Sequence, residues 1–181
     1  MPTNPAAVQP APVRRIITGH TDDGKAIFAD DQPVQPYPFK GSTTLFTDLF
    51  WQEGFPAKND GDFAEQVKTH DSEIVNVKGS LLRSVDIPPH TESFFHRTIS
   101  LDYGILIQGA LTLILDDNKR VLMKPGDVVV QRGTIHAWRN ETDEWTRMYF
   151  VLLPADKVSA GGKELEIEFN PIPAAWKAPS S

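Results

Sequence analysis

Short apolar runs, each bounded by turn-forming residues, follow one another through the central part of the chain. Val, Ile, Leu, Phe and Tyr dominate these runs, and Gly, Pro, Asn and Asp stand between them. Such runs are typical of β-strands, and their regular spacing, with no convincing long helix between them, favours an antiparallel sandwich or barrel. The strands expected here span residues 81–87, 94–100, 103–108, 110–115, 119–123, 128–132, 136–140 and 145–153.

The pattern of the first 72 residues is less regular. Residues 1–12 are rich in Pro and Ala and indicate a disordered arm. Residues 13–72 predict a hairpin followed by a segment that wraps the surface. The hairpin joins Val13–His20 to residues 26–29 through a turn at residues 22–25, which contain the Asp-Asp-Gly sequence that favours tight turns.

The segment after the hairpin is rich in proline. Pro33, Pro36 and Pro38 argue against regular pairing, because proline lacks a backbone N–H, so we expect this segment to lie over the surface. Residues 43–51 fit two interpretations, since their apolar spacing suits a helix while their Thr and aromatic content favours a strand. The polar residues 56–72 predict a loop.

The rest of the chain divides into a barrel at residues 73–155 and a C-terminal segment at residues 156–181. Residues 165–169 alternate with Glu and predict an edge strand, since outward charge protects an exposed sheet edge. Residues 171–181 predict a loose tail. No internal repeat is visible, so one barrel is expected and not two.

Composition narrows the range of functions. A chain of 181 residues that is 40% hydrophobic suits one globular domain, and a net charge of −6 with scattered Lys and Arg argues against a nucleic-acid partner. The absence of Cys excludes disulfides, thiolate metal sites and Cys nucleophiles. No secretory signal and no run of about 18 apolar residues is seen, so we expect a cytoplasmic protein that does not bind membranes.

The stretch from Lys124 to Asn140 carries the candidate chemistry. It reads as a Pro-Gly-Asp turn, a short buried strand, a Gly turn and a strand that opens with His136. His136, Trp138 and Asn140 share one face of that strand, because strand side chains alternate with period two. A His, a Trp and an amide on one wall indicate the lining of a site.

This stretch resembles the second signature of the cupins, which reads Gly-Asp, a strand, Pro-x-Gly-x-x-His, three residues and Asn. Gly133, His136 and Asn140 match the signature. Two departures are present, because Gln131 stands at the Pro position and the strand is one residue shorter.

The first cupin signature is His-x-His, three or four residues, Glu, six residues and Gly. Counted back from Gly109, it places Asp102 at the Glu position, Thr98 at the second His and His96 at the first. His90 replaces the Gly that opens the signature.

The resemblance covers roughly residues 80–153 and implies an antiparallel double-stranded β-helix, the jelly-roll barrel of the cupins, here with N-terminal strands and an extended arm. The sequence around residues 13–20 and 96–104 is similar to a single-domain cupin subfamily of bacteria and fungi, several members of which act in natural-product pathways. Some fungal relatives are labelled oxidoreductases. The resemblance also implies a homodimer, for which residues 13–50 are the candidate interface or pocket lid.

Cupins commonly hold one divalent metal with three His and one Glu, and such ligands suit Fe, Mn, Ni or Zn. The inward set implied here is His96, Thr98, Asp102 and His136. Because a Thr hydroxyl is a poor ligand, two imidazoles and one carboxylate remain, which is the ligand set of non-haem Fe(II) oxygenases. The resemblance therefore leaves open either no cofactor or one divalent metal held by His96, Asp102 and His136.

A metal-free interpretation uses the same residues for acid–base chemistry. His136 or His96 would move a proton near neutral pH, and Asp102 would orient an imidazole and stabilise its cationic form. Dehydration, isomerisation, cyclisation or decarboxylation of a small polyketide-like compound would suit this set.

The candidate substrate-binding residues surround these three. Trp138 would stack on a planar substrate, and Arg83 or Gln108 would hold a carbonyl oxygen. Thr98 completes the candidate set. Tyr103 has the opposite parity to its neighbour in the strand, so it is expected to pack outward.

Three functions stay open, namely a lyase or isomerase, a metal-dependent oxidoreductase or dioxygenase using iron, and a ligand-binding cupin without chemistry. Several residues also have a purely structural interpretation. Asp102 would pair with Arg97 or Arg147, and Asn140 would tie a loop. The histidines with no assigned role are His20, His70 and His90.

Overall fold

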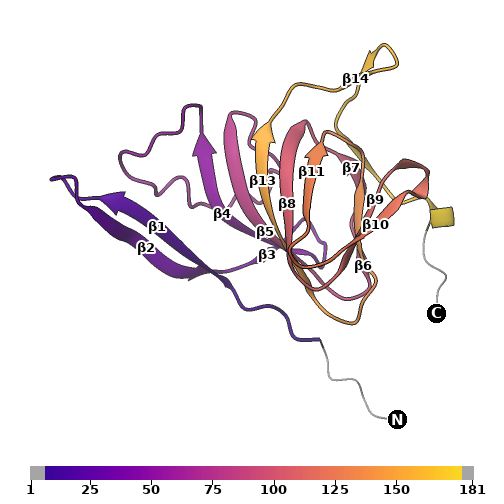
Figure 1. The fold of residues 1–181 in the computed structure, drawn as a ribbon, viewed down its shortest axis with the longest axis horizontal. Coiled ribbons are helices and arrows are strands. Elements are labelled where there is room, and N and C mark those ends of the chain that lie inside the picture. Colours follow the sequence, from indigo (N-terminus) through magenta and orange to yellow (C-terminus); the bar gives the residue numbers. More distant parts are fainter. Residues whose placement is uncertain (1–6, 177–181) are drawn as a thin grey trace, which may run out of the picture.

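The computed structural model describes residues 7–176, whose regular structure is almost entirely antiparallel β-strand (Figure 1). The N-terminal strands are β1 (Val13–His20), β2 (Ala26–Val34), β3 (Tyr37–Pro38) and β4 (Leu45–Glu53). The barrel strands are β5 (Gly79–Ile87), β6 (Thr91–Glu92), β7 (Phe95–Arg97), β8 (Ser100–Gln108), β9 (Leu111–Ile114), β10 (Arg120–Met123), β11 (Val128–Arg132), β12 (Ala137–Asn140) and β13 (Thr146–Pro154). The C-terminal strands are β14 (Ser159–Ala160), β15 (Lys163–Glu164) and β16 (Glu168–Asn170), and two short 3₁₀ helices lie at Asp116–Asn118 and Ala174–Trp176.

Two sheets form the barrel. One has six strands in the order β11-β8-β13-β5-β4-β3, and the other has four in the order β10-β9-β12-β6. All named pairs are antiparallel, so the expected all-β antiparallel architecture is confirmed. In Figure 1 the two sheets curve around a common interior.

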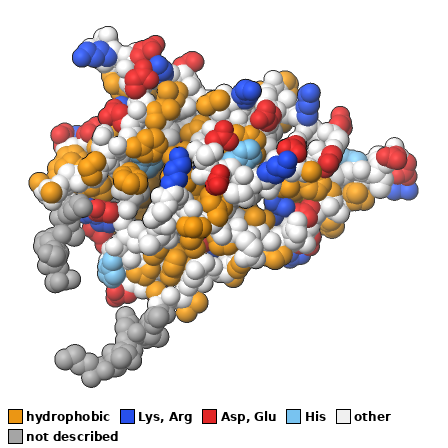
Figure 2. Space-filling view, turned by 180° about the vertical axis from the view of Figure 1, so that it is seen from behind, with side chains coloured by type: hydrophobic (Ala, Val, Ile, Leu, Met, Phe, Trp, Pro, Cys, Tyr) orange, Lys and Arg blue, Asp and Glu red, His pale blue; other side chains and the backbone are white. Residues whose placement is uncertain are grey.

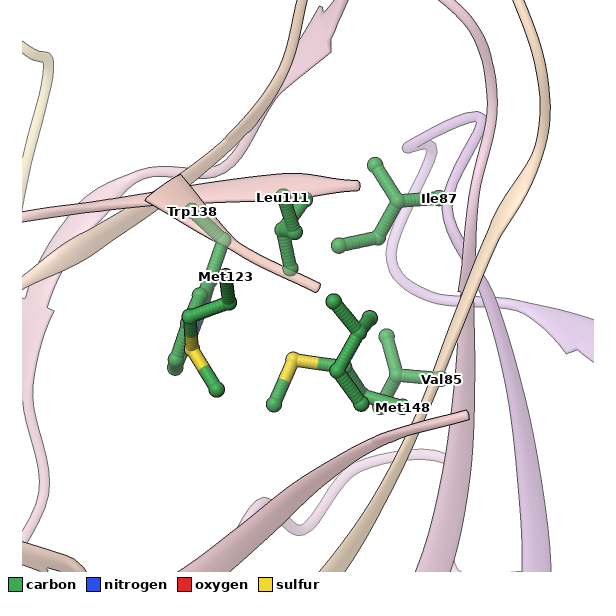
Figure 3. Close-up of a cluster of buried hydrophobic side chains, with 7 residues drawn as sticks. Val85, Ile87, Leu111, Met123, Trp138 and Met148 are labelled. Carbon is green, nitrogen blue, oxygen red and sulfur yellow. The ribbon is translucent and has the colours of Figure 1, made fainter. Parts of the chain in front are cut away.

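A cluster of buried apolar side chains joins the two sheets (Figure 3). Its members from the six-stranded sheet are Val85, Ile87, Leu106 and Met148, and those from the four-stranded sheet are Leu111, Met123 and Trp138. Burying one such side chain contributes roughly 1.5–3 kcal/mol. The cluster therefore fixes how the two sheets face each other, and with them the walls of the interior.

The N-terminal hairpin forms as β1 and β2 and extends from one side of the barrel, at the left of Figure 1. The expected irregular path through the prolines is wrong at two of the three. Pro33 lies within β2 and pairs with Arg14, and Pro38 lies within β3 and pairs with Leu45. Both strands are at sheet edges, where a missing N–H need not leave a carbonyl unpaired.

Three other segments differ from or refine the sequence expectations. Residues 43–51, which fitted either a helix or a strand, contribute to strand β4. The strand expected at residues 94–100 is interrupted, because β7 ends at Arg97 and β8 begins at Ser100. In the N-terminal arm, whose residues 1–6 lie outside the described part, Pro10 is buried and the carbonyl oxygen of Ala11 accepts a 2.8 Å hydrogen bond from Arg147.

The C-terminal segment is more ordered than expected. The edge strand is limited to Glu168–Asn170, and it pairs with β7. Ile172 is buried in a cluster with Phe95, and Trp176 packs edge-on against the same ring at 5.6 Å between centroids. The expected loose tail is therefore wrong for residues 171–176, while residues 177–181 lie outside the described part.

On the face shown in Figure 2, apolar side chains form patches with acidic and basic side chains interspersed between them. Within residues 7–176 no helix has the length and apolarity needed to cross a membrane.

Candidate functional site

A cavity of about 150 Å³ lies inside the barrel. Its aromatic lining consists of Phe39, Phe46, Phe94, Trp138, Phe150 and Phe169. Its polar lining consists of Ser42, Thr44, Arg83, Glu92, Ser93, His96, Thr98, Asp102 and His136. The structure thus places most of the sequence-predicted site residues, from four different strands and the turns between them, around one interior space.

Backbone pairing brings the two candidate histidines together. The amide of His96 donates to the carbonyl of His136 at 2.8 Å, and the amide of His136 donates to the carbonyl of His96 at 2.9 Å. This isolated antiparallel bridge puts the two ring centroids 4.2 Å apart. Two residues far apart in the sequence are therefore held side by side by the main chain, not by side-chain packing alone.

His136 has a hydrogen-bond partner at both ring nitrogens. Its Nδ1 lies 3.0 Å from the carbonyl oxygen of Thr134, and the Nε2 amide nitrogen of Gln131 lies 2.8 Å from Nδ1 and 3.0 Å from Nε2. Because a carbonyl oxygen only accepts, Nδ1 carries the proton, and the Gln131 amide can then donate only to Nε2. Burial, with a smaller contribution from the charge of His96, lowers the pKa of His136 to about 3, so this ring is neutral.

His96 differs from His136 because one of its nitrogens is left without a partner. Its Nδ1 lies 2.8 Å from the carbonyl oxygen of Phe94 and therefore carries the proton. Among the described residues, no hydrogen bond reaches its Nε2. The ring is half-buried and stacks parallel to Phe169 at 5.9 Å, and burial lowers the pKa of His96 below its ordinary value.

Asp102 is a buried carboxyl group that forms no ion pair with the residues that the structure describes. It is 5% exposed, and its Oδ1 is buried without a hydrogen-bond partner within the described residues. Burial raises the pKa of Asp102 to about 6, against a smaller opposing effect of Ser100. The alternative pairing with Arg97 or Arg147 does not form, since Arg97 contacts Glu168 and Arg147 contacts Asp86.

Thr98 and Trp138 both line the cavity, but in different ways. The Thr98 hydroxyl accepts a 2.8 Å hydrogen bond from Ser100, so it is part of the wall. Trp138 packs edge-on against His136 at 5.7 Å between centroids and also belongs to the core cluster. Its face is therefore shared between the core and the site.

Two other candidates have different positions from those expected. Gln108 is exposed at the end of β8 and does not line the cavity, because a β-bulge interrupts the pairing of β13 with β8 next to this residue. Asn140 is fully buried, and its amide donates to the carbonyl oxygens of Ile87, Pro88 and Glu144, so it ties a loop and does not reach the cavity.

Arg83 lines the cavity, but its guanidinium is largely engaged by protein groups. Its Nε donates to Asp48 at 2.5 Å, and its other nitrogens donate to the Tyr37 hydroxyl and to the carbonyls of Glu73 and Ile74. Its role is therefore first of all structural. The histidines His20, His70 and His90 do not line the cavity.

The residues around the cavity do not fit the divalent metal that the resemblance implies. Within residues 7–176, no three His, Asp or Glu side chains are grouped so that they could hold a metal ion. Asp102 therefore does not join His96 and His136 in a three-ligand cluster. In addition, both nitrogens of His136 already have partners in Thr134 and Gln131.

Sequence reasoning missed three residues of this site. Gln131 was visible only as a departure from the Pro of the signature, which was its one available signal. Phe94 and Phe169 line the cavity although they are 60% and 50% exposed, so they lie at its mouth. Both stood in stretches interpreted only as strands, with no pattern that distinguishes a cavity mouth from a surface.

Comparisons with known proteins agree with this architecture. A cupin domain family model matches residues 83–152. The chain is 34% identical over 159 residues to the cupin-domain-containing oxidoreductase fogC of Aspergillus ruber, which covers 85% of this chain and 78% of that protein. It is 36% identical over 165 residues to the Oryzines biosynthesis cluster protein J of Aspergillus oryzae, which covers 84% of this chain and 89% of that protein. The crystal structure of the cupin-2 domain protein Rru_A2000 from Rhodospirillum rubrum shares the fold, with a TM-score of 0.51 at 14% identity over 97% of this chain and 86% of that one.

Proposed function

The chain belongs to the cupin domain family. We propose that it is a small-molecule enzyme of secondary metabolism that moves protons on a planar, uncharged substrate. The observation that carries the proposal is the Nε2 of His96, an imidazole nitrogen without a partner beside an aromatic cavity. Relatives in fungal biosynthesis clusters support the metabolic context.

His96 is the general base in this proposal. Its Nδ1–H is fixed on the Phe94 carbonyl, so only Nε2 is available to accept a proton. Because burial lowers the pKa of His96, the ring stays unprotonated to a lower pH than an exposed histidine does. The substrate proton moves to Nε2, and the electron pair it leaves passes into the substrate.

Asp102 is the general acid. With its pKa raised to about 6, it carries a proton in mildly acidic solution and gives it to the substrate at a second position. Isomerisation results if that position is a carbon, and dehydration results if it is a hydroxyl that leaves as water. Proton exchange with water then restores the neutral imidazole and the protonated carboxyl group for the next turnover.

The lining determines which substrates suit the site. A cavity of about 150 Å³ is comparable to the apolar cavities that hold one benzene ring, and six aromatic side chains line it. Among the described residues that line the cavity, the one Lys or Arg side chain is that of Arg83, and it already contacts the carboxylate of Asp48. Both features favour an uncharged ring over an anion.

A second candidate function is oxidoreduction, because a relative that is 34% identical carries the name of a cupin-domain-containing oxidoreductase. Such chemistry would need a cofactor, and the described residues offer no preformed three-ligand site. Metal analysis of the protein purified under anaerobic conditions tests this candidate. About one equivalent of iron per chain, with turnover that is lost on chelation, would favour it over acid–base chemistry.

The homodimer implied by the family resemblance stays a prediction. It is supported by apolar residues on the outer face of β8 and β11, where Val128 is 60% and Val130 is 54% exposed, and by β11 being an edge strand. Sedimentation equilibrium of the full chain measures the oligomeric state, and a monomer at all concentrations would overturn this prediction.

The test of the acid–base proposal uses a probe that needs only a base. Ring opening of a nitrobenzisoxazole removes one proton from carbon while the ring N–O bond breaks, and it needs no cofactor. We expect the protein to accelerate it, and His96→Gln to lower the rate by roughly 10²–10⁴-fold, the usual contribution of a general base. Chelation should leave the rate unchanged. A wild-type rate equal to that of free imidazole at the same concentration would contradict the proposal.

A further inference from the structure

Gln131 is the residue at which this chain departs from the cupin signature, and it contacts the site directly. It lies on β11, where Val128 and Val130 point outward, while the side chain of Gln131 is only 4% exposed. A buried glutamine at a position where the signature has proline therefore points into the barrel, and its amide ends beside the imidazole of His136.

The hydrogen bonds around His136 determine which tautomer is present. The Thr134 carbonyl holds the proton on Nδ1, which leaves the lone pair on Nε2. The Gln131 amide nitrogen lies 2.8 Å from Nδ1 and 3.0 Å from Nε2, and in this tautomer it can donate only to the Nε2 lone pair. In the opposite tautomer the Nδ1 lone pair would face the Thr134 carbonyl oxygen at 3.0 Å, so this carbonyl would lose its donor in a buried site. Such an arrangement costs the full desolvation of an unpaired buried group.

Gln131 also lies opposite the acid in the sheet. Gln131 and Asp102 are directly opposed in the pairing of β11 with β8. The Oε1 of Gln131 and the Oδ1 of Asp102 are both buried without a hydrogen-bond partner in the described part of the chain. Two acceptor oxygens on opposed residues require a donor, which a proton on Asp102 would supply.

We propose that Gln131 is a positioning residue that engages the Nε2 lone pair of His136, whose Nδ1–H the Thr134 carbonyl fixes, and thereby leaves His96 as the histidine that reacts. The consequence for catalysis rests on the proposed function, whereas the tautomer of His136 does not.

The tautomer can be read by nitrogen-15 NMR of the imidazole rings in the full-length protein at neutral pH. In the wild type, we expect His136 to show a protonated Nδ1 and an unprotonated Nε2. The variant Gln131→Glu replaces the amide donor by a carboxylate that only accepts, so a proton should appear on Nε2 of His136. The variant Gln131→Met removes the donor while keeping the volume, so the proton should stay on Nδ1 while the Nε2 signal shifts toward that of an imidazole nitrogen without a hydrogen bond.

Gln52→Glu is the matched control. Gln52 is also a buried glutamine on a strand, but its amide donates to the carbonyls of Glu53 and Gly54 and not to a histidine. It should leave the His136 signals unchanged. An Nε2–H tautomer in the wild type, or His136 signals that do not change in Gln131→Glu, would overturn the proposal, and the wild-type measurement decides even if a variant does not fold.

The outcomes separate this inference from the function. The expected tautomer in a protein that does not open the nitrobenzisoxazole ring would keep the role of Gln131 at His136 and reject the proposed chemistry. Ring opening that depends on His96, together with an Nε2–H tautomer at His136, would keep the chemistry and reject the role of Gln131.

Discussion

Two buried polar clusters each contribute side chains to the lining of the same cavity, and they differ in whether their polar atoms have partners. In the first, Arg83 donates to Asp48 at 2.5 Å, Tyr37 donates to the second oxygen of Asp48 at 2.9 Å, and the amide of His70 donates to that oxygen at 2.8 Å. The guanidinium also stacks over Phe46 at 4.7 Å. Charge is paired with charge, and both carboxylate oxygens have partners.

In the second cluster, polar atoms are left without partners. Asp102 and Gln131 each have a buried oxygen without a hydrogen bond among the described residues, and the Nε2 of His96 has none. The pKa values move accordingly, because burial lowers that of His96 and raises that of Asp102 to about 6. Within residues 7–176 no ion pair reaches these groups.

The difference between the clusters separates stability from function. Buried polar groups in folded proteins are normally satisfied, so a saturated cluster is what folding alone requires. Unsatisfied groups reduce stability, and they are retained where a ligand completes them. By this criterion Arg83 belongs to the architecture and His96 belongs to the site, although both line the cavity.

The largest expected effect on stability comes from breaking the first cluster, in which Arg83 is paired with Asp48. Arg83→Met leaves the Asp48 carboxylate buried without its cation, so the free energy of unfolding should fall by about 3–5 kcal/mol. Urea denaturation followed by tryptophan fluorescence measures it. A loss below about 1 kcal/mol would show that the two clusters do not differ in the way described.

In the second cluster, a substitution is expected to increase the free energy of unfolding. Because the pKa of Asp102 is raised in the folded state, its contribution to stability is present below its ordinary pKa and is lost as the pH rises through about 6. Asp102→Asn removes this penalty and should increase the free energy of unfolding at pH 8 by roughly 2–3 kcal/mol. The gain should vanish near pH 4, and turnover of the natural substrate should fall. A variant that is less stable than the wild type at pH 8 would contradict the buried, uncompensated carboxyl group.

The smallest effect is expected from a substitution at the mouth of the cavity. Phe169 stacks on His96 and is half exposed, so Phe169→Leu should weaken binding of planar substrates or probes by a few-fold, since one aromatic contact contributes about 0.5–1.5 kcal/mol. Stability should change by less than about 0.5 kcal/mol. Phe28→Leu, at a more exposed phenylalanine on the N-terminal hairpin, is the control. Equal effects of the two substitutions on the Michaelis constant for the nitrobenzisoxazole would remove Phe169 from the site.

The sequence was informative where local patterns decide the structure. Alternating apolar runs and Gly turns predicted the barrel strands. Strand parity put His96 and Asp102 on one face, and the resemblance to the cupin signatures implied that His136 joins them. Contacts between distant segments were not predictable. The saturation of Arg83 depends on Asp48 and on carbonyls of the loop before β5, which no periodicity connects.

The errors have similar causes. Gln108 has the parity of Asp102, but the bulge beside Arg147 and the end of the strand take it out of the barrel. The proline rule failed at Pro33 and Pro38 because both lie in edge strands, a property of the whole sheet. The role of Gln131 depends on how the turn at Gly133 returns the chain onto β12, which residue types alone do not specify.

The central claim is that the two neighbouring histidines are unequal, with a free nitrogen on His96 and none on His136. Diethyl pyrocarbonate reacts with unprotonated imidazole nitrogens that are free, and peptide mapping of the modified wild-type protein gives a rate for each histidine. We predict that His96 is modified while His136 stays unmodified under the same conditions. Modification of His136 at the rate of His96, or failure of His96 to react, would contradict the account.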